Sequence, residues 1–284
     1  MIRFATNNDI IGIIRLWQEA FGDSEKEIKF FLDNKFKPQN TLVFEESNHI
    51  VSMLFLLDGK MCIKGIDYPA YYLYAACTAQ SHRGRGIMSD LLKAAEKSAF
   101  ERNIDFICLL PAEDSLYDYY ARFGYQAVFS EKLLSIKRNE TSMQSEFSFN
   151  IATSAGLEML RDYAYNDTDC FKWDDTAISF AFDHCKMYGG YSALARNGYA
   201  LYSIIDSKIH VKEYAFTHGE LQFFTNYLFK KHDIEEIIIT LPYNFETDIG
   251  KSTVQKSGMM LPIRKEVKHL ANDVKNAYLG LTLD

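Results

Sequence analysis

The sequence predicts an α/β (α+β) fold with a mixed central sheet, followed by a second, less complete unit of the same kind. Strand-like apolar segments alternate with segments of helical periodicity from residue 2 to residue 136. A second series follows in the order strand–strand–strand–helix–strand, which is also the order of residues 41–110. We therefore expect one domain at residues 1–138, a polar linker at 139–147 and a second domain at 148–284.

The first domain begins with a short strand over 2–6 and two helices. Asn7-Asn8-Asp9 can cap a helix over Ile10–Phe21, whose apolar residues recur at helical spacing. Ser24 and Glu27 have the spacing of a capping box, which predicts a second helix to about Phe36. We then expect strands over 41–45, 49–57, 61–66 and 71–78, a helix over 86–102, a strand over 105–110, a helix over 115–123 and a strand over 125–136.

The second domain is predicted from the same signals. Its helices are expected over 174–187 and 218–231, and its strands over 191–196, 200–205, 208–216, 236–241 and, less regularly, 277–283. Asn197-Gly198 and Asp206-Ser207 are turn signals that separate the first three of these strands.

Composition limits the classes of function. Apolar residues make up 48% and charged residues 24% of 284, which is ordinary for a globular protein. A net charge of −7 disfavours general nucleic-acid binding. The five cysteines are odd in number and include no CxxC pair, which disfavours a zinc site and a disulfide framework. With no signal peptide and no apolar run long enough for a membrane span, we expect a cytoplasmic protein without a metal; its oligomeric state stays open.

The most informative stretch is YYLYAACTAQSHRGRG, residues 71–86. An apolar strand ends at Thr78, a loop with two glycines follows, and a helix begins directly after Gly86. The first amides of a helix have no intrahelical partner and, with the helix dipole, form an anion site. Gly84 would let an anion approach the backbone closely, and Arg83 and Arg85 would add positive charge. We expect a phosphate or pyrophosphate here.

Two common phosphate-binding motifs fit this loop poorly. A P-loop ends in Gly-Lys-Ser/Thr, whereas this loop continues with Gly86-Ile87-Met88. A dinucleotide fingerprint needs a third glycine, and position 89 is serine.

The segment Arg83-Gly84-Arg85-Gly86-Ile87-Met88 resembles the pyrophosphate loop of the GNAT acyltransferase superfamily, Arg/Gln-x-x-Gly-x-Gly/Ala, except at Met88. The order of elements over residues 2–136 is also similar to that fold. Within the superfamily, residues 77–88 and Tyr120-Ala-Arg-Phe-Gly-Tyr125 resemble the tandem-GNAT enhanced intracellular survival family, without its sterol-carrier-like domain. The resemblance implies a GNAT-type mixed sheet followed by a degenerate GNAT-like domain.

The resemblance also implies roles for individual residues. Acetyl-CoA would bind through the backbone of Arg83, Gly84, Arg85, Gly86, Ile87 and Met88, and its pantetheine arm would follow Ala76, Cys77 and Thr78. Tyr120 is the expected proton donor to the departing thiolate, with Tyr117, one turn earlier, as the alternative. An oxyanion would be stabilised by a backbone amide near Cys77. The family is thought to use its C-terminal carboxylate as the general base, which corresponds to Asp284.

The expected activity is transfer of an acetyl group from acetyl-CoA to a primary amine by direct attack in a ternary complex. The acceptor could be a small amine, an aminoglycoside-like polyamine, or the N-terminus or a lysine of a peptide. A non-catalytic acyl-CoA-binding sensor is the alternative, because the loop alone requires binding and not turnover. The second domain has no RxxGxG loop, which predicts a single CoA site.

Overall fold

The computed structural model describes residues 1–140 and 156–282. Contacts within the chain divide it into two compact units, which are described separately. Unit 1 comprises Met1–Gly59, Tyr68–Gln126 and Met259–Ala271, and unit 2 comprises Lys60–Asp67, Ala127–Gly258 and Asn272–Asp284. This division differs from the expected domains at 1–138 and 148–284, because residues 60–67 and 127–138 belong to unit 2 and residues 259–271 belong to unit 1.

Unit 1 contains a mixed sheet with the strand order β1-β2-β3-β4-β5-β12. The β1–β2, β2–β3 and β5–β12 pairs are antiparallel, whereas β4 and β5 are parallel. The elements are β1 (Ile2–Phe4), α1 (Ile10–Phe21), α2 (Glu25–Lys35), β2 (Thr41–Glu46), β3 (His49–Ile63), β4 (Ile66–Thr78), α3 (Ile87–Glu101), β5 (Phe106–Leu109), α4 (Ser115–Ala121) and the end of β12 (Lys251–Pro262).

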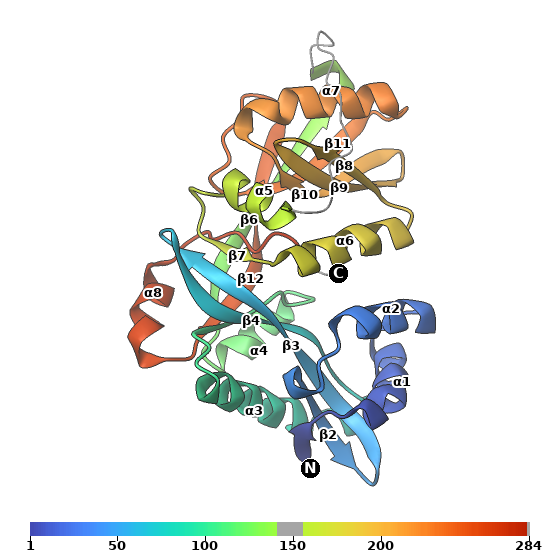
Figure 1. Ribbon diagram of the computed structural model, residues 1–284, viewed down its shortest axis with the longest axis vertical. Helices are drawn as coiled ribbons and strands as arrows, with labels where there is room; N and C mark the ends of the chain where they lie inside the picture. Colours follow the sequence, from blue (N-terminus) through green and yellow to red (C-terminus); the bar gives the residue numbers. More distant parts are fainter. Residues whose placement is uncertain (141–155, 283–284) are drawn as a thin grey trace. The chain divides into compact units, whose positions relative to one another are not determined.

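Helices cover both faces of the unit 1 sheet (Figure 1). On one face, Trp17 of α1 packs against Phe31 of α2 and Phe55 of β3, with ring centroids 5.0 and 5.5 Å away. On the other, α3 and α4 bury Leu91 and Tyr120 against a cluster that includes Leu54. Side chains alternate between the faces of a strand, so neighbouring residues of β3 belong to the two different cores.

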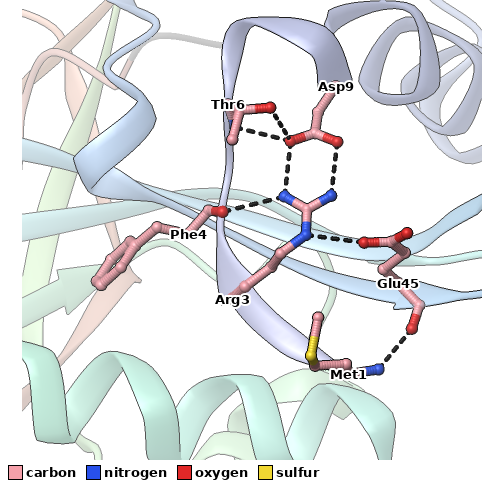
Figure 2. A network of polar contacts seen from close by, with 6 residues as sticks. All are labelled: Met1, Arg3, Phe4, Thr6, Asp9 and Glu45. Carbon is pink, nitrogen blue, oxygen red and sulfur yellow. Dashed lines mark hydrogen bonds and ion pairs between the residues drawn. The ribbon is translucent and has the colours of Figure 1, made fainter. Parts of the chain in front are cut away.

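The two predicted helix starts are confirmed. The α1 helix has the predicted bounds, and the Ser24–Glu27 capping box makes both of its hydrogen bonds, Ser24 N–H to Glu27 Oε2 at 2.7 Å and Glu27 N–H to Ser24 Oγ at 3.3 Å. Asp9 also anchors the strand before α1 (Figure 2). Its carboxylate accepts two 2.7 Å bonds from Arg3, whose Nε donates to Glu45 at 2.8 Å. These bonds join β1, the start of α1 and β2.

The prediction of separate strands over 49–57 and 61–66 is wrong. The β3 strand runs without interruption from His49 to Ile63 and turns into β4 at Lys64-Gly65, where both residues have positive φ. The polar residues Asp58-Gly59-Lys60 lie inside this strand, which is hydrogen-bonded to β4 and, at Lys60–Cys62, also to β7 (Cys170–Lys172).

Unit 2 repeats the element order of residues 41–110, as expected. Its sheet has the order β12-β6-β11-β10-β9-β8, and β10 and β11 are parallel, as β4 and β5 are. The elements are β6 (Gln126–Lys137), α5 (Leu157–Ala164), β7 (Cys170–Lys172), α6 (Asp175–Met187), β8 (Tyr191–Ala195), β9 (Gly198–Ile205), β10 (Lys208–Ala215), α7 (Leu221–Lys231), β11 (Glu236–Pro242), the start of β12 and α8 (Lys268–Asp273), whose last residues belong to this unit.

One expectation for this half is wrong, another lies partly outside the described residues, and four elements were not expected. The expected strand over 277–283 is absent from the described part, residues 277–282. Ala277 and Tyr278 make only isolated bridges, to Phe129 and Cys170. Gly280 has φ 65°, which lies outside the range of a β-strand. Of the expected linker at 139–147, residues 139 and 140 belong to a short 3-10 helix, Arg138–Glu140, and residues 141–147 are not described. The α5, β7, β12 and α8 elements were not predicted.

Candidate active site

The neighbouring parallel strands β4 and β5 separate after a short pairing. Ala70, Tyr71 and Tyr72 of β4 are the Cα partners of Phe106, Ile107 and Cys108, and β5 ends one residue later. The remainder of β4, residues 73–78, extends beyond this pairing. A strand that loses its neighbour exposes one row of backbone donors and acceptors, to which an extended ligand can bind.

The separated part of β4 is distorted at its centre. Ala75 has φ 48°, a left-handed conformation that alanine adopts only at a cost in energy. Beyond it, the Cys77 carbonyl accepts a 2.8 Å bond from Ser52 Oγ of β3, which fixes the strand end. Cys77 is 7% exposed, and burial raises the pKa of its thiol to about 12. The thiol is therefore neutral at physiological pH and unsuited to nucleophilic attack.

The loop between β4 and α3 presents open backbone amides. Gly84 and Gly86 have φ 75° and 79°, and a Cβ at either position would meet no atom within 4 Å. The first helical bond of α3 runs from Asp90 N–H to Gly86 O, at 3.1 Å. Within the described parts of the chain, no acceptor is hydrogen-bonded to the amides of Gly84–Ser89. With the helix dipole, these amides form an anion-binding geometry.

The two arginines of the loop differ in their contacts. Arg83 Nε donates to the Thr78 carbonyl at 3.0 Å and so ties the loop to the end of β4. Arg85 forms a two-point ion pair with Glu46, at 2.7 and 3.0 Å, instead of adding free positive charge to the loop. Ile87 is buried and Met88 half-buried against the unit 1 core, so their side chains point away from the loop surface.

The two candidate tyrosines lie on α4, and both pack against the same core cluster. Tyr120 is 8% exposed and contacts the ring of Tyr125 with a centroid distance of 5.6 Å. Its hydroxyl has no hydrogen-bond partner among the described residues and is not one of the oxygens sealed from solvent. Burial raises the pKa of Tyr120 to about 12. Tyr117 is half-buried.

Tyr119, which was not a candidate, connects α4 to the loop helix. Its Oη lies 3.5 Å from Ser89 Oγ in the first turn of α3. This contact, the Ala75 distortion and the Glu46 carboxylate are features of the site that sequence reasoning missed. Only Glu46 has a sequence signal, since the polar segment Glu46-Ser47-Asn48, between the strands expected over 41–45 and 49–57, is typical of a turn.

No general base is identified within the described chain. The separated segment 73–78 contains no carboxylate. Asp284, the residue suggested by resemblance, lies outside the described residues.

Residues 1–128 match the family model of the acetyltransferase (GNAT) domain. The match covers the separated strands, the glycine loop and the tyrosines of α4. The first 128 residues of this chain form a GNAT acetyltransferase domain. Thus the GNAT assignment made from residues 83–88 is confirmed for this part of the chain. No curated protein sequence matches the chain.

Solved structures extend the likeness of the GNAT fold to nearly the whole chain. Eis1 from Mycobacterium abscessus aligns at 14% identity and a TM-score of 0.72, over 94% of this chain and 75% of that one. A GCN5-related N-acetyltransferase from Kribbella flavida aligns at 16% identity and a TM-score of 0.71, over 92% of this chain and 70% of that one. A GCN5-related N-acetyltransferase from Anabaena variabilis aligns at 13% identity and a TM-score of 0.71, over 93% of this chain and 73% of that one. At these identities the comparison establishes the mixed α/β fold.

The position in unit 2 that corresponds to the loop is built differently. The β10 and β11 strands pair over Lys208–Val211 and then also separate, next to an irregularity in β10. Aromatic rings pack together there: the ring centroid of Tyr214 lies 5.3 Å from that of Phe224 and 5.9 Å from that of Phe245. The chain before α7, Thr217-His218-Gly219-Glu220, lacks the paired glycines and carries an acidic residue at the helix start.

The described residues, 1–140 and 156–282, contain no helix both long and apolar enough to cross a membrane. They also contain no cluster of three or more histidine, cysteine, aspartate or glutamate side chains arranged to hold a metal ion.

Proposed function

We propose that the protein is an N-acetyltransferase that moves an acetyl group from acetyl-CoA to a primary amine. The observation that carries the proposal is the row of open amides at Gly84–Ser89, placed directly after a strand that has separated from its neighbour. A diphosphate fits the open amides, and an extended amide-containing arm fits the strand edge. The acetyltransferase names of the structural neighbours support the same reaction class.

The cofactor would bind through the backbone of residues 83–88 and along Ala76–Thr78. Gly84 and Gly86 allow the diphosphate to approach, because nothing occupies the space where a side chain would stand. Arg83 holds the loop against the strand end through Thr78. The pantetheine arm would add to the free edge of β4, as an added strand does.

The reaction needs an amine positioned near the thioester carbon and a donor for the developing oxyanion. A backbone amide near Cys77, two residues beyond the distorted Ala75, would stabilise the oxyanion. The C–S bond then breaks, and the sulfur leaves as a thiolate.

Tyr120 would donate a hydrogen bond to this thiolate. With its pKa raised to about 12, the phenol keeps its proton at physiological pH. Complete transfer of that proton to a thiolate of ordinary pKa, ~8.5, is uphill by roughly 5 kcal/mol at ~1.4 kcal/mol per unit. Tyr120 therefore acts first as a hydrogen-bond donor, and binding of the cofactor would have to lower its pKa for full protonation. Tyr117 stays the alternative donor.

The proposal leaves the base to water or to Asp284. Removal of Asp284 with unchanged turnover would exclude the terminal carboxylate and leave water-relayed deprotonation.

The test is release of CoA thiol from acetyl-CoA over a library of small amines, polyamines and peptides. Amine-dependent thiol release supports the enzyme. Micromolar CoA binding with no release for any amine supports the acyl-CoA sensor. No shift in melting temperature and no heat of binding with CoA contradicts both.

A further inference from the structure

Glu46 is the last residue of β2, and its carboxylate reaches the loop before α3. The chain turns back at Ser47 and Asn48, which have φ 51° and 63°. The carboxylate accepts bonds from Arg85 Nη2 at 2.7 Å and Nη1 at 3.0 Å, and it lies 3.0 Å from His82 Nε2. One acidic side chain thus binds both basic residues that flank Arg83.

In the Arg85–Glu46 ion pair, the carboxylate binds the guanidinium in the geometry that a phosphate would need. Arginine recognises carboxylate and phosphate through the same two-point fork of N–H groups. While both Nη atoms are bound to Glu46, the end of the Arg85 guanidinium that carries this fork is not open to a diphosphate on the neighbouring amides. The pKa of Glu46 is lowered by Arg85, so the carboxylate is ionised at neutral pH and opposes an anionic ligand.

The pair is also exchangeable. The side chains of Arg85 and Glu46 are 48% and 37% exposed, and ion pairs in such positions are weak because water and salt screen them. A diphosphate held by several amides at once is a stronger partner for a guanidinium than one solvated carboxylate.

We propose that Glu46 competes with the CoA diphosphate for Arg85. The Glu46 carboxylate binds Arg85 until the cofactor arrives. Binding then requires Arg85 to exchange Glu46 for a phosphate oxygen. Glu46 is a positioning residue that sets the affinity and salt dependence of cofactor binding, and no bond of the reaction forms on it. This inference rests on the proposed CoA-dependent function.

The experiment is calorimetric titration of CoA into the full chain and three variants, Glu46→Gln, Arg85→Gln and the double variant. Glutamine keeps an acceptor for Arg85 but removes the charge. We expect Glu46→Gln to bind CoA about three- to ten-fold more tightly at low salt, as loss of a repulsive rim charge does, and the gain to shrink at high salt. Arg85→Gln should weaken binding more in the Glu46→Gln background than in the wild type.

Two controls separate electrostatic competition from a change in loop structure. Glu45→Gln makes the same charge change one residue away, on a side chain whose ion pair is with Arg3 at 2.8 Å, and should leave CoA affinity nearly unchanged. S-acetylpantetheine lacks the diphosphate, so its apparent affinity should be the same for wild type and Glu46→Gln.

The outcomes are distinct. If the wild type does not bind CoA, the proposed function fails. If the wild type binds CoA but Glu46→Gln binds it equally or more weakly, the competitor role is overturned. Tighter binding of S-acetylpantetheine by the same variant would also overturn it, because the effect would not act through phosphate.

Discussion

At the scale of single residues, the two arginines of the glycine loop differ in their partners. In the structure Arg83 is bonded to the Thr78 carbonyl, and Arg85 is neutralised by Glu46. Glu46 lies 39 residues earlier in the chain, so the pairing depends on a strand arrangement that local pattern does not reveal.

Replacement of Arg83 tests the loop more strongly than replacement of Arg85. Arg83→Glu removes the bond to Thr78 and places a negative charge beside the open amides. We expect CoA affinity to fall at least about ten-fold, as for charge reversal in an anion site. Isothermal titration measures it, with Arg196→Glu in unit 2 as the control for net charge. Equal affinities in the two variants would remove Arg83 from the site.

Tyr120 can be tested without disturbing the packing of its ring. Tyr120→Phe should lower kcat by about 10²-fold, the usual contribution of a proton-donating group, and change the KM for acetyl-CoA by less than about three-fold. Since its pKa in the free protein is raised to about 12, the phenol keeps its proton up to pH 10, and kcat/KM for acetyl-CoA should show no alkaline decrease from its ionisation in that range. If Tyr117→Phe has the larger effect on kcat, the donor is Tyr117.

At the scale of elements, the predictions succeed where the signal is local. The α1 helix follows from apolar periodicity, without a side-chain cap from Asp9, and α2 follows from the capping box at its start. The length of β3 was missed because the polar residues 58–60 are part of a strand whose partners are β4 and, at Lys60–Cys62, β7, more than 100 residues later. The β12 strand was missed because its first residues are polar and exposed, and its pairing with β5 is equally distant. Strand pairing across the chain overrides local composition.

The Asp9 network gives a prediction about pH (Figure 2). Hydrogen bonds from Arg3 lower the pKa of Asp9 to about 2. Because the folded-state pKa lies below the unfolded value of ~3.9, this stabilisation is complete above pH ~5 and is lost as the pH falls toward 2. Asp9→Asn should therefore reduce the free energy of unfolding by about 1–2 kcal/mol at pH 7, with the difference disappearing near pH 2. Denaturant titrations at both pH values measure it, and a difference that persists at pH 2 would contradict the assignment.

At the scale of the whole molecule, the sequence predicted two similar series of elements but not how the chain is shared between them. The hairpin end at residues 60–67 and strand β6 belong to unit 2, whereas the last part of β12 belongs to unit 1. Such exchanges depend on strand partners and not on composition, so no linker marks them. The candidate site was nonetheless predictable, because its strand, loop and helix are contiguous from residue 71 to residue 101.

Unit 2 contains a buried charge pair. Arg161 of α5 and Glu213 of β10 are 1% and 0% exposed and are joined at 2.7 Å. Glu213→Gln would leave Arg161 buried without a counter-charge, which typically costs about 3–5 kcal/mol of unfolding free energy. Glu236→Gln is the matched control, because Glu236 pairs with the half-exposed Lys208, and its effect should be much smaller. Equal losses in chemical denaturation would show that the buried pair has no special role.

The most direct test is an electron-density map of the protein with bound CoA. The account predicts the diphosphate within hydrogen-bond distance, ~3 Å, of the backbone amides of Gly84–Met88, and the pantetheine arm along Ala76–Thr78. A diphosphate bound elsewhere, with those amides left to solvent, would contradict it.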